Sequence, residues 1–135
     1  MESKTDPTKS LEQLEGVSWG QPEFNSTLVV RCHELRKKPL REMTAEDLRV
    51  LVGQGIGLDF LAPLALDLLD TDPLVAGDLY RGDLLAAVIR IDERFWSSHE
   101  DLYWALREVL VEVKTIAEFL ADEQDRVTTL LELNV

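Results

Sequence analysis

Apolar side chains recur every three or four residues along most of the chain, which is the spacing of one face of an α-helix. Cap residues, prolines and glycines divide this pattern into segments. The predicted helices cover residues 10–16, 26–38, 44–52, 58–70, 83–91 and 98–120, and a further helical segment is expected in the tail at 122–135. For the second segment, 26–38, a strand is an alternative, because Val29 and Val30 are both β-branched. Together these segments predict an all-α domain of five to seven helices.

Several helix starts carry a signal of their own. Ser10 is followed by Gln13, and Thr44 by Asp47, at the spacing of a capping box. The predicted N-caps are Ser10, Thr44, Asp83 and Ser98. The segment that Ser98 opens is the longest, and its apolar residues alternate in steps of three and four: Leu102, Leu106, Val109, Val113, Ile116 and Leu120. This stripe is expected to be buried in an intramolecular bundle, with an intermolecular coiled coil as the alternative.

Length and composition describe one domain. The chain has 135 residues, and 45% of them are apolar, which is enough for a single core. Residues 1–9 are polar and are expected to form a flexible N-terminus, and residues 10–135 a single helical domain that is monomeric when free. One cysteine excludes an internal disulfide and a cysteine-rich zinc site. Neither a signal peptide nor an apolar run of bilayer length is present, so a soluble cytoplasmic protein without membrane contact is expected.

Charge is the most informative part of the composition. The formal net charge is −12, which argues against direct binding of nucleic acid. Residues 1–41 carry seven basic and six acidic side chains, so the remainder holds −13. Acids gather between Asp59 and Asp83, where Arg81 is the one opposing cation, and again between Glu118 and Asp125. Such surfaces either keep a protein in solution or meet a basic partner.

No catalytic pattern emerges. The string GQGIG at 53–57 follows a predicted helix and lacks the spacing of a dinucleotide loop, so it is interpreted as a helix stop and a turn. Cys32 and His33 are adjacent, and adjacent side chains on a helix diverge by about 100°. Cys32 is therefore expected to be a small core residue, and His99 to have a surface or capping role. The sequence predicts neither an enzyme nor a bound cofactor or metal ion.

Five strings taken together resemble a known family. They are LEQLE at 11–15, LRKKPL at 35–40, EDLRVLVGQGIGL at 46–58, PLALDLL at 63–69 and GDLYRGDLL at 77–85, with Trp19 also fitting. In this order and spacing they are similar to the bacterial immunity proteins of contact-dependent growth inhibition. The resemblance covers roughly residues 10–100, and the last third of the chain resembles the family only in being helical.

This resemblance implies a protein that binds the C-terminal toxin domain of a cognate effector and blocks its active site or substrate access. Many such toxins are nucleases, whose basic surfaces would suit an acidic partner. The residues expected to contact the toxin are Asp70, Asp72, Asp78 and Tyr80, in the connection at 70–83. The competing interpretation is a helical adaptor or regulatory domain that docks a protein through an apolar groove, for which a large exposed apolar patch would be the sign.

Overall fold

The computed structural model describes residues 5–23 and 26–134, and within these ranges the regular secondary structure is helical. The helices are α1 (Leu11–Glu15), α2 (Thr27–Leu35), the 3-10 helix η1 (Leu40–Glu42), α3 (Ala45–Gly53), α4 (Leu58–Thr71), α5 (Asp83–Val88), α6 (Glu93–Ser98) and α7 (Glu100–Leu131). The all-α prediction is confirmed. The second segment, for which a strand was left open, forms the helix α2.

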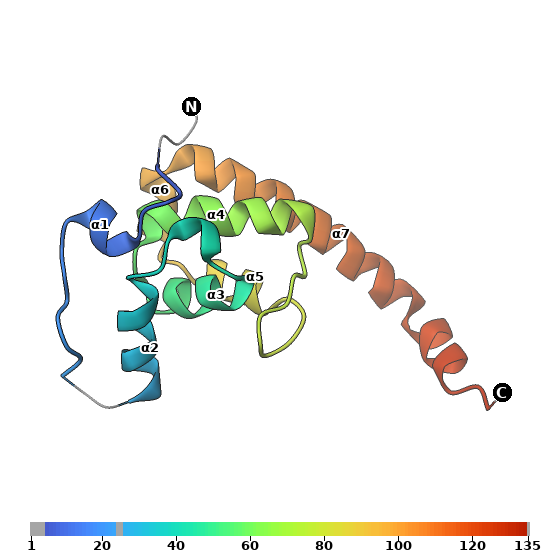
Figure 1. The fold of residues 1–135 in the computed structure, drawn as a ribbon. Helices are drawn as coiled ribbons and strands as arrows, with labels where there is room; N and C mark the ends of the chain where they lie inside the picture. Colours follow the sequence, from blue (N-terminus) through green and yellow to red (C-terminus); the bar gives the residue numbers. More distant parts are fainter. Residues whose placement is uncertain (1–4, 24–25, 135) are drawn as a thin grey trace.

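The apolar helix α4 lies between α3 and α7 (Figure 1). It also contacts α5, and α3 in turn packs against α5 and α2. The buried side chains of α4 lie within about 140° around the helix axis, so they form one broad face. They are Leu61, Ala62, Ala65, Leu66 and Leu69, whereas Leu64 and Leu68 are partly buried.

Two predicted capping boxes are confirmed. The Ser10 hydroxyl accepts a hydrogen bond from the backbone N–H of Gln13, and the Gln13 side chain accepts one from the backbone N–H of Ser10. Thr44 and Asp47 make the same reciprocal pair at the start of α3. Each pair satisfies two backbone donors that a helix start otherwise leaves free. These short-range signals fix where α1 and α3 begin.

The start of the longest helix differs from the prediction. Residues Glu93–Ser98 form a separate short helix, α6, and α7 begins at Glu100. The Ser98 hydroxyl donates to the carbonyl oxygen of Arg94 (2.9 Å), so Ser98 ends α6 and does not cap α7. His99 occupies the cap position with non-helical backbone angles, φ −132° and ψ 66°. The sequence pattern did not predict α6, because six residues are too few to show a sustained period of apolar positions.

The string GQGIG forms the predicted stop and turn. Helix α3 ends at Gly53, and Gly57 is the N-cap of α4 with φ +63°, in the left-handed region. A Cβ atom on Gly57 would lie 2.7 Å from Cδ1 of Leu11, a fully buried side chain. Glycine is therefore required both by the backbone angle and by the close approach of α1.

The described part of the N-terminal segment pairs with the chain after α2. The backbone N–H of Leu40 donates to the carbonyl of Lys9 (3.0 Å), and that of Arg41 to the carbonyl of Pro7 (2.9 Å). Ser10 and Pro39 form an isolated antiparallel bridge. Residues 1–4 of the expected flexible N-terminus lie outside the described residues.

Candidate interaction surface

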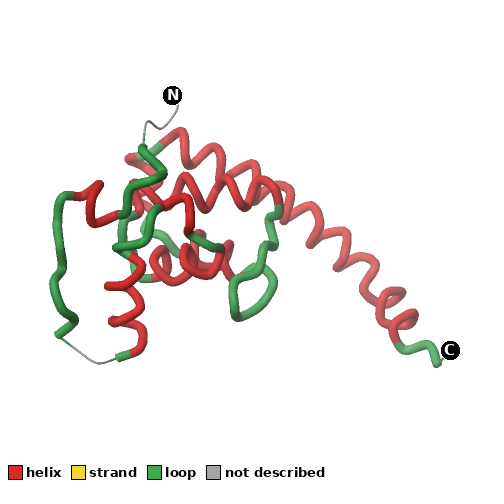
Figure 2. The backbone as a smooth tube through the Cα atoms, viewed as in Figure 1, coloured by secondary structure: helices red, strands yellow, loops and turns green. Residues whose placement is uncertain are grey.

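Asp83 organises the connection between α4 and α5, residues 72–82, which loops out beside the helices (Figure 2). Its buried carboxylate accepts hydrogen bonds from the backbone N–H groups of Gly77 (2.6 Å), Leu79 (3.0 Å) and Tyr80 (3.4 Å). Burial acts to raise the pKa of Asp83, but these hydrogen bonds outweigh it and the pKa lies below its ordinary value. The prediction that Asp83 caps α5 is wrong: Gly82 holds that position, and the Asp83 side chain turns back to the connection.

Helix α3 holds the same connection from the other side. Oε1 of Glu46 accepts the backbone N–H of Asp78 (2.9 Å) and also the Nε–H of Arg49 (2.6 Å). Nη2 of Arg49 donates to Oε2 of Glu46 (2.5 Å), and Nε of Arg49 lies 3.8 Å from Oδ2 of Asp83. The strings at 46–58 and 77–85 thus contact each other through charged side chains. A single sequence gives no signal for this pairing, because residues 46 and 78 are 32 positions apart.

A second ionic cluster joins α2 to α3. The carboxylate of Asp47 is buried and accepts hydrogen bonds from Arg31 Nη2 (3.0 Å) and Lys38 Nζ (2.5 Å) in addition to its capping bond. Burial acts to raise the pKa of Asp47, but the bonds from Lys38 and Thr44 outweigh it, so the pKa lies below its ordinary value. Arg31 and Lys38, two of the basic side chains within residues 1–41, are therefore bound to a carboxylate of the protein itself.

Arg36 ties the strings at 11–15 and 35–40 together. Its guanidinium is buried, donates to Oε1 of Glu15 (2.6 Å) and to the carbonyl of Val17 (3.1 Å), and lies 4.3 Å from the centre of the Trp19 ring. Such a stacked, hydrogen-bonded arginine links neighbouring segments. Several charged residues of the resemblance strings, including Arg36, Glu46, Asp47 and Arg49, thus maintain the fold.

The residues predicted to contact a partner lie on the α4–α5 connection and the end of α4, but they do not line one common hollow. Asp70 and Asp78 are exposed. Tyr80 is 57% exposed and lines a hollow of about 200 Å³ that also includes Arg49 and Arg90. Asp72 lines a different hollow, next to α7. Oδ1 of Asp72 accepts the backbone N–H of Leu74 (3.1 Å), so this acid also shapes the turn after α4.

The hollow beside Asp72 is lined mostly by apolar side chains. It encloses about 300 Å³ where the α4–α5 connection meets α7. Its lining residues are Asp72, Pro73, Leu74 and Arg81 from the connection and Val113, Ile116, Ala117 and Leu120 from α7. Nη2 of Arg81 lies 3.6 Å from Oδ1 of Asp72, which places an exposed ion pair within an otherwise apolar lining. We call this hollow the root pocket, because it lies where α7 leaves the body.

The prediction that the whole stripe of α7 is buried is wrong. Leu106 and Val109 are buried, and Leu102 and Val113 are partly buried against the core. Ile116 is 43% exposed and Leu120 50%. The reason is length: α4 has 14 residues and α7 has 32, which correspond to about 21 Å and about 48 Å of helix. Residues 114–131, which we call the projecting half, extend beyond the body (Figure 1).

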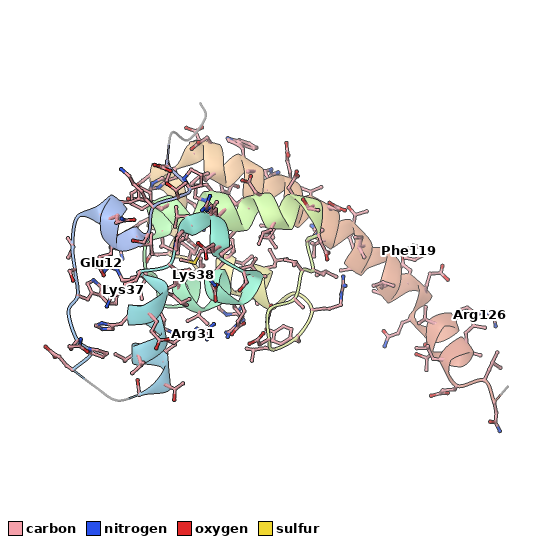
Figure 3. The ribbon with its side chains drawn as sticks, in the orientation of Figure 1. Glu12, Arg31, Lys37, Lys38, Phe119 and Arg126 are labelled. Atoms are coloured by element: carbon pink, nitrogen blue, oxygen red, sulfur yellow. The ribbon has the colours of Figure 1, made fainter. Side chains whose placement is uncertain are left out.

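The molecule is also divided by charge. Arg31, Lys37 and Lys38 lie at the α2 end, and Phe119 and Arg126 mark the projecting half at the opposite end (Figure 3). The projecting half contains four acids against two bases: Glu118, Asp122, Glu123 and Asp125 against Lys114 and Arg126. Asp70 and Asp72 lie at the end of α4, which packs beside α7, and Asp78 lies in the connection that follows. The acidic end therefore includes both the connection and α7.

Cys32 and His99 both make contacts that suit a structural role. Cys32 is buried, and burial raises the pKa of its thiol, as expected of a small core residue. The His99 ring stacks on Phe95 at 4.0 Å, and its Nε2 lies 3.1 Å from Oδ1 of Asp59. Within residues 5–23 and 26–134, no cluster of three or more histidine, cysteine or acidic side chains could hold a metal ion. The described helices also include none with the length and apolarity needed to span a bilayer.

The contacts among the resemblance strings hold the body together. A comparison with known families shows which family the chain belongs to. The family model described as CDI immunity proteins matches residues 13–106. The match covers more than half of the chain, so the protein belongs to this family, and the resemblance noted in the sequence is confirmed. No curated protein and no solved structure matches the chain. The family match ends at Leu106, before the projecting half begins.

Proposed function

We propose that this protein binds the C-terminal toxin domain of a cognate contact-dependent growth inhibition effector and neutralises it. The observation that carries the proposal is the family match over residues 13–106. The protein acts stoichiometrically in the cytoplasm, as a monomer before it meets the toxin, and it needs no cofactor. It blocks the toxin's active site or the access of substrate to it.

The charge distribution supports a basic toxin surface as the target. The net charge is −12, and the basic side chains Arg31 and Lys38 are bound to Asp47 within the fold. An acidic face can occupy a site that otherwise receives phosphates, so a nuclease is the class of toxin that this charge fits. Asp70, Asp72 and Asp78 form the contact edge, and Tyr80, exposed beside them, serves as an anchor.

The first experiment measures binding and protection. The C-terminal domain of the effector encoded directly upstream is prepared as an inactive variant and titrated with this protein. Protection is measured as growth of cells that produce the active domain together with the immunity protein. Binding with protection supports the proposal, and absence of binding contradicts it. An apolar adaptor is the second candidate, because of the root pocket and the exposed stripe of α7, and it predicts no binding to this domain.

The second experiment tests the acidic edge. Charge reversal at Asp70 and Asp78, with Asp72→Asn to keep the turn at Leu74, is expected to slow association and flatten its dependence on salt. Tyr80→Ala is expected to raise the dissociation rate by about tenfold or more. The control reverses Glu118 and Asp122, which helical geometry places on the side of α7 opposite the stripe. If only the control set slows association, the toxin binds another face.

A further inference from the structure

The projecting half of α7 continues the face that the first half buries. A helix turns about 100° per residue, so Ile116, Val127 and Leu131 lie within about 40° of Leu120 around the axis. Leu106 and Val109, which are buried against the body, lie within the same arc. The apolar stripe therefore continues on the same face of α7 after the helix has left the core. Its exposed members are Ile116, Leu120, Val127 and Leu131.

The stripe begins at the root pocket. Ile116 and Leu120 form part of the α7 wall of that pocket, and Pro73 and Leu74 face them from the α4–α5 connection. A ridge of apolar side chains inserted there would meet apolar groups on two sides and the Asp72–Arg81 pair beside them. A hollow of about 300 Å³ with such walls can accept one or two side chains of an anchor.

Charge decides what kind of partner fits this face. Glu123 lies about 60° from Leu120 around the helix axis, at the edge of the stripe, and Glu112 lies on the same side. A second copy would bring the same acidic edge against itself, and the whole chain carries −12. A partner with basic side chains beside an apolar ridge would neutralise Glu112, Glu123 and the acids of the connection.

We infer that the projecting half of α7 and the root pocket form a docking site for an apolar ridge flanked by basic side chains on the toxin domain. This inference rests on the proposed function and names a second surface that contributes to toxin binding. The exposed part of the stripe, from Ile116 onward, lies beyond the body and outside the family match, which ends at Leu106. It gives the chain a contact surface of its own, in addition to the acidic edge.

The test is a comparison of two faces of one helix. Ile116→Ala with Leu120→Ala truncates the stripe, and Val111→Ala is the matched control. Val111 is 54% exposed, close to the 50% of Leu120, and lies about 180° from it around the helix. Each variant is titrated against the inactive toxin domain encoded directly upstream. The stripe variant is expected to bind at least tenfold more weakly. The control is expected to bind within twofold of the unmodified protein.

A charge variant extends the test without touching the pocket lining. Glu123→Lys is expected to weaken toxin binding severalfold, more strongly at low salt, because it places a cation opposite the basic flank. Circular dichroism and thermal melting of all variants establish that they are folded.

Failure of the docking site differs from failure of the proposed function. If the unmodified protein binds the toxin domain and the stripe variant binds equally well, the docking site is wrong and toxin binding stands. If the unmodified protein does not bind, the proposed function fails and the site loses its partner. A dimer in sedimentation experiments that Leu120→Ala dissociates would make a second copy the occupant and would overturn the inference.

Discussion

The two halves of α7 carry the same apolar stripe, yet one half is part of the core and the other is not. In the first half, Leu106 and Val109 are buried against the body. In the projecting half, Leu120 and Val127 occupy the same face and are 50% and 40% exposed. The difference shows that an amphipathic pattern specifies a face to be covered, and that the lengths of the neighbouring helices decide where the chain itself can cover it.

The largest contrast between body and projecting half is expected from truncating one leucine in each. Leu69 of α4 is fully buried, so Leu69→Ala should lower the free energy of unfolding by about 2–5 kcal/mol, because it removes buried methyl groups and leaves a cavity. Leu120→Ala should change it by less than about 0.5 kcal/mol. Urea unfolding of both variants measures the difference, and equal losses would mean that the stripe is covered in solution.

A smaller loss of stability is expected from adding a methyl group at Gly57, where α1 approaches the backbone closely. Gly57→Ala forces a left-handed backbone angle on alanine and places its Cβ 2.7 Å from Leu11, so a loss of about 1–3 kcal/mol is expected. Gly55 has a similar φ of +70° with open space around it, so Gly55→Ala should cost only the backbone strain, about 1 kcal/mol. Urea unfolding of the pair separates strain from steric overlap. Equal losses would contradict the close approach of α1.

Acid should weaken the body through its two buried aspartates. The pKa values of Asp47 and Asp83 lie below the ordinary 3.8, so the folded state binds fewer protons than the unfolded chain. Their contribution is complete above about pH 4 and is lost as the pH falls toward the lower folded values. Urea unfolding between pH 7 and 3 measures this loss. Asp47→Asn should reduce it, and an unchanged pH profile in that variant would contradict the assignment.

The smallest effect on stability is expected from removing the end of the projecting half. Deletion of residues 122–135 takes away helix whose described side chains are exposed, so the free energy of unfolding should change by less than about 0.5 kcal/mol. The helical signal in circular dichroism should fall in proportion to the residues removed. A loss of several kcal/mol would show that this segment folds back on the body.

The sequence predicted the features whose causes are local. The capping boxes at Ser10 and Thr44 were correct because both partners lie within three residues, and the turn at Gly57 because glycine marks it. The contact between Glu46 and the backbone of Asp78 could not be predicted, because it depends on how α3 packs beside α5. The exposure of Ile116 and Leu120 depends on where α4 ends relative to α7, which periodicity does not encode.

The projecting half also has an optical consequence. The three tryptophans are Trp19 over Arg36, Trp96 in the core and Trp104 near the start of α7, so none lies within residues 114–131. Intrinsic fluorescence therefore reports on the body and is silent about the half that extends from it. Phe119, 63% exposed on that half, is a position where a single introduced indole would give the projecting helix its own emission signal.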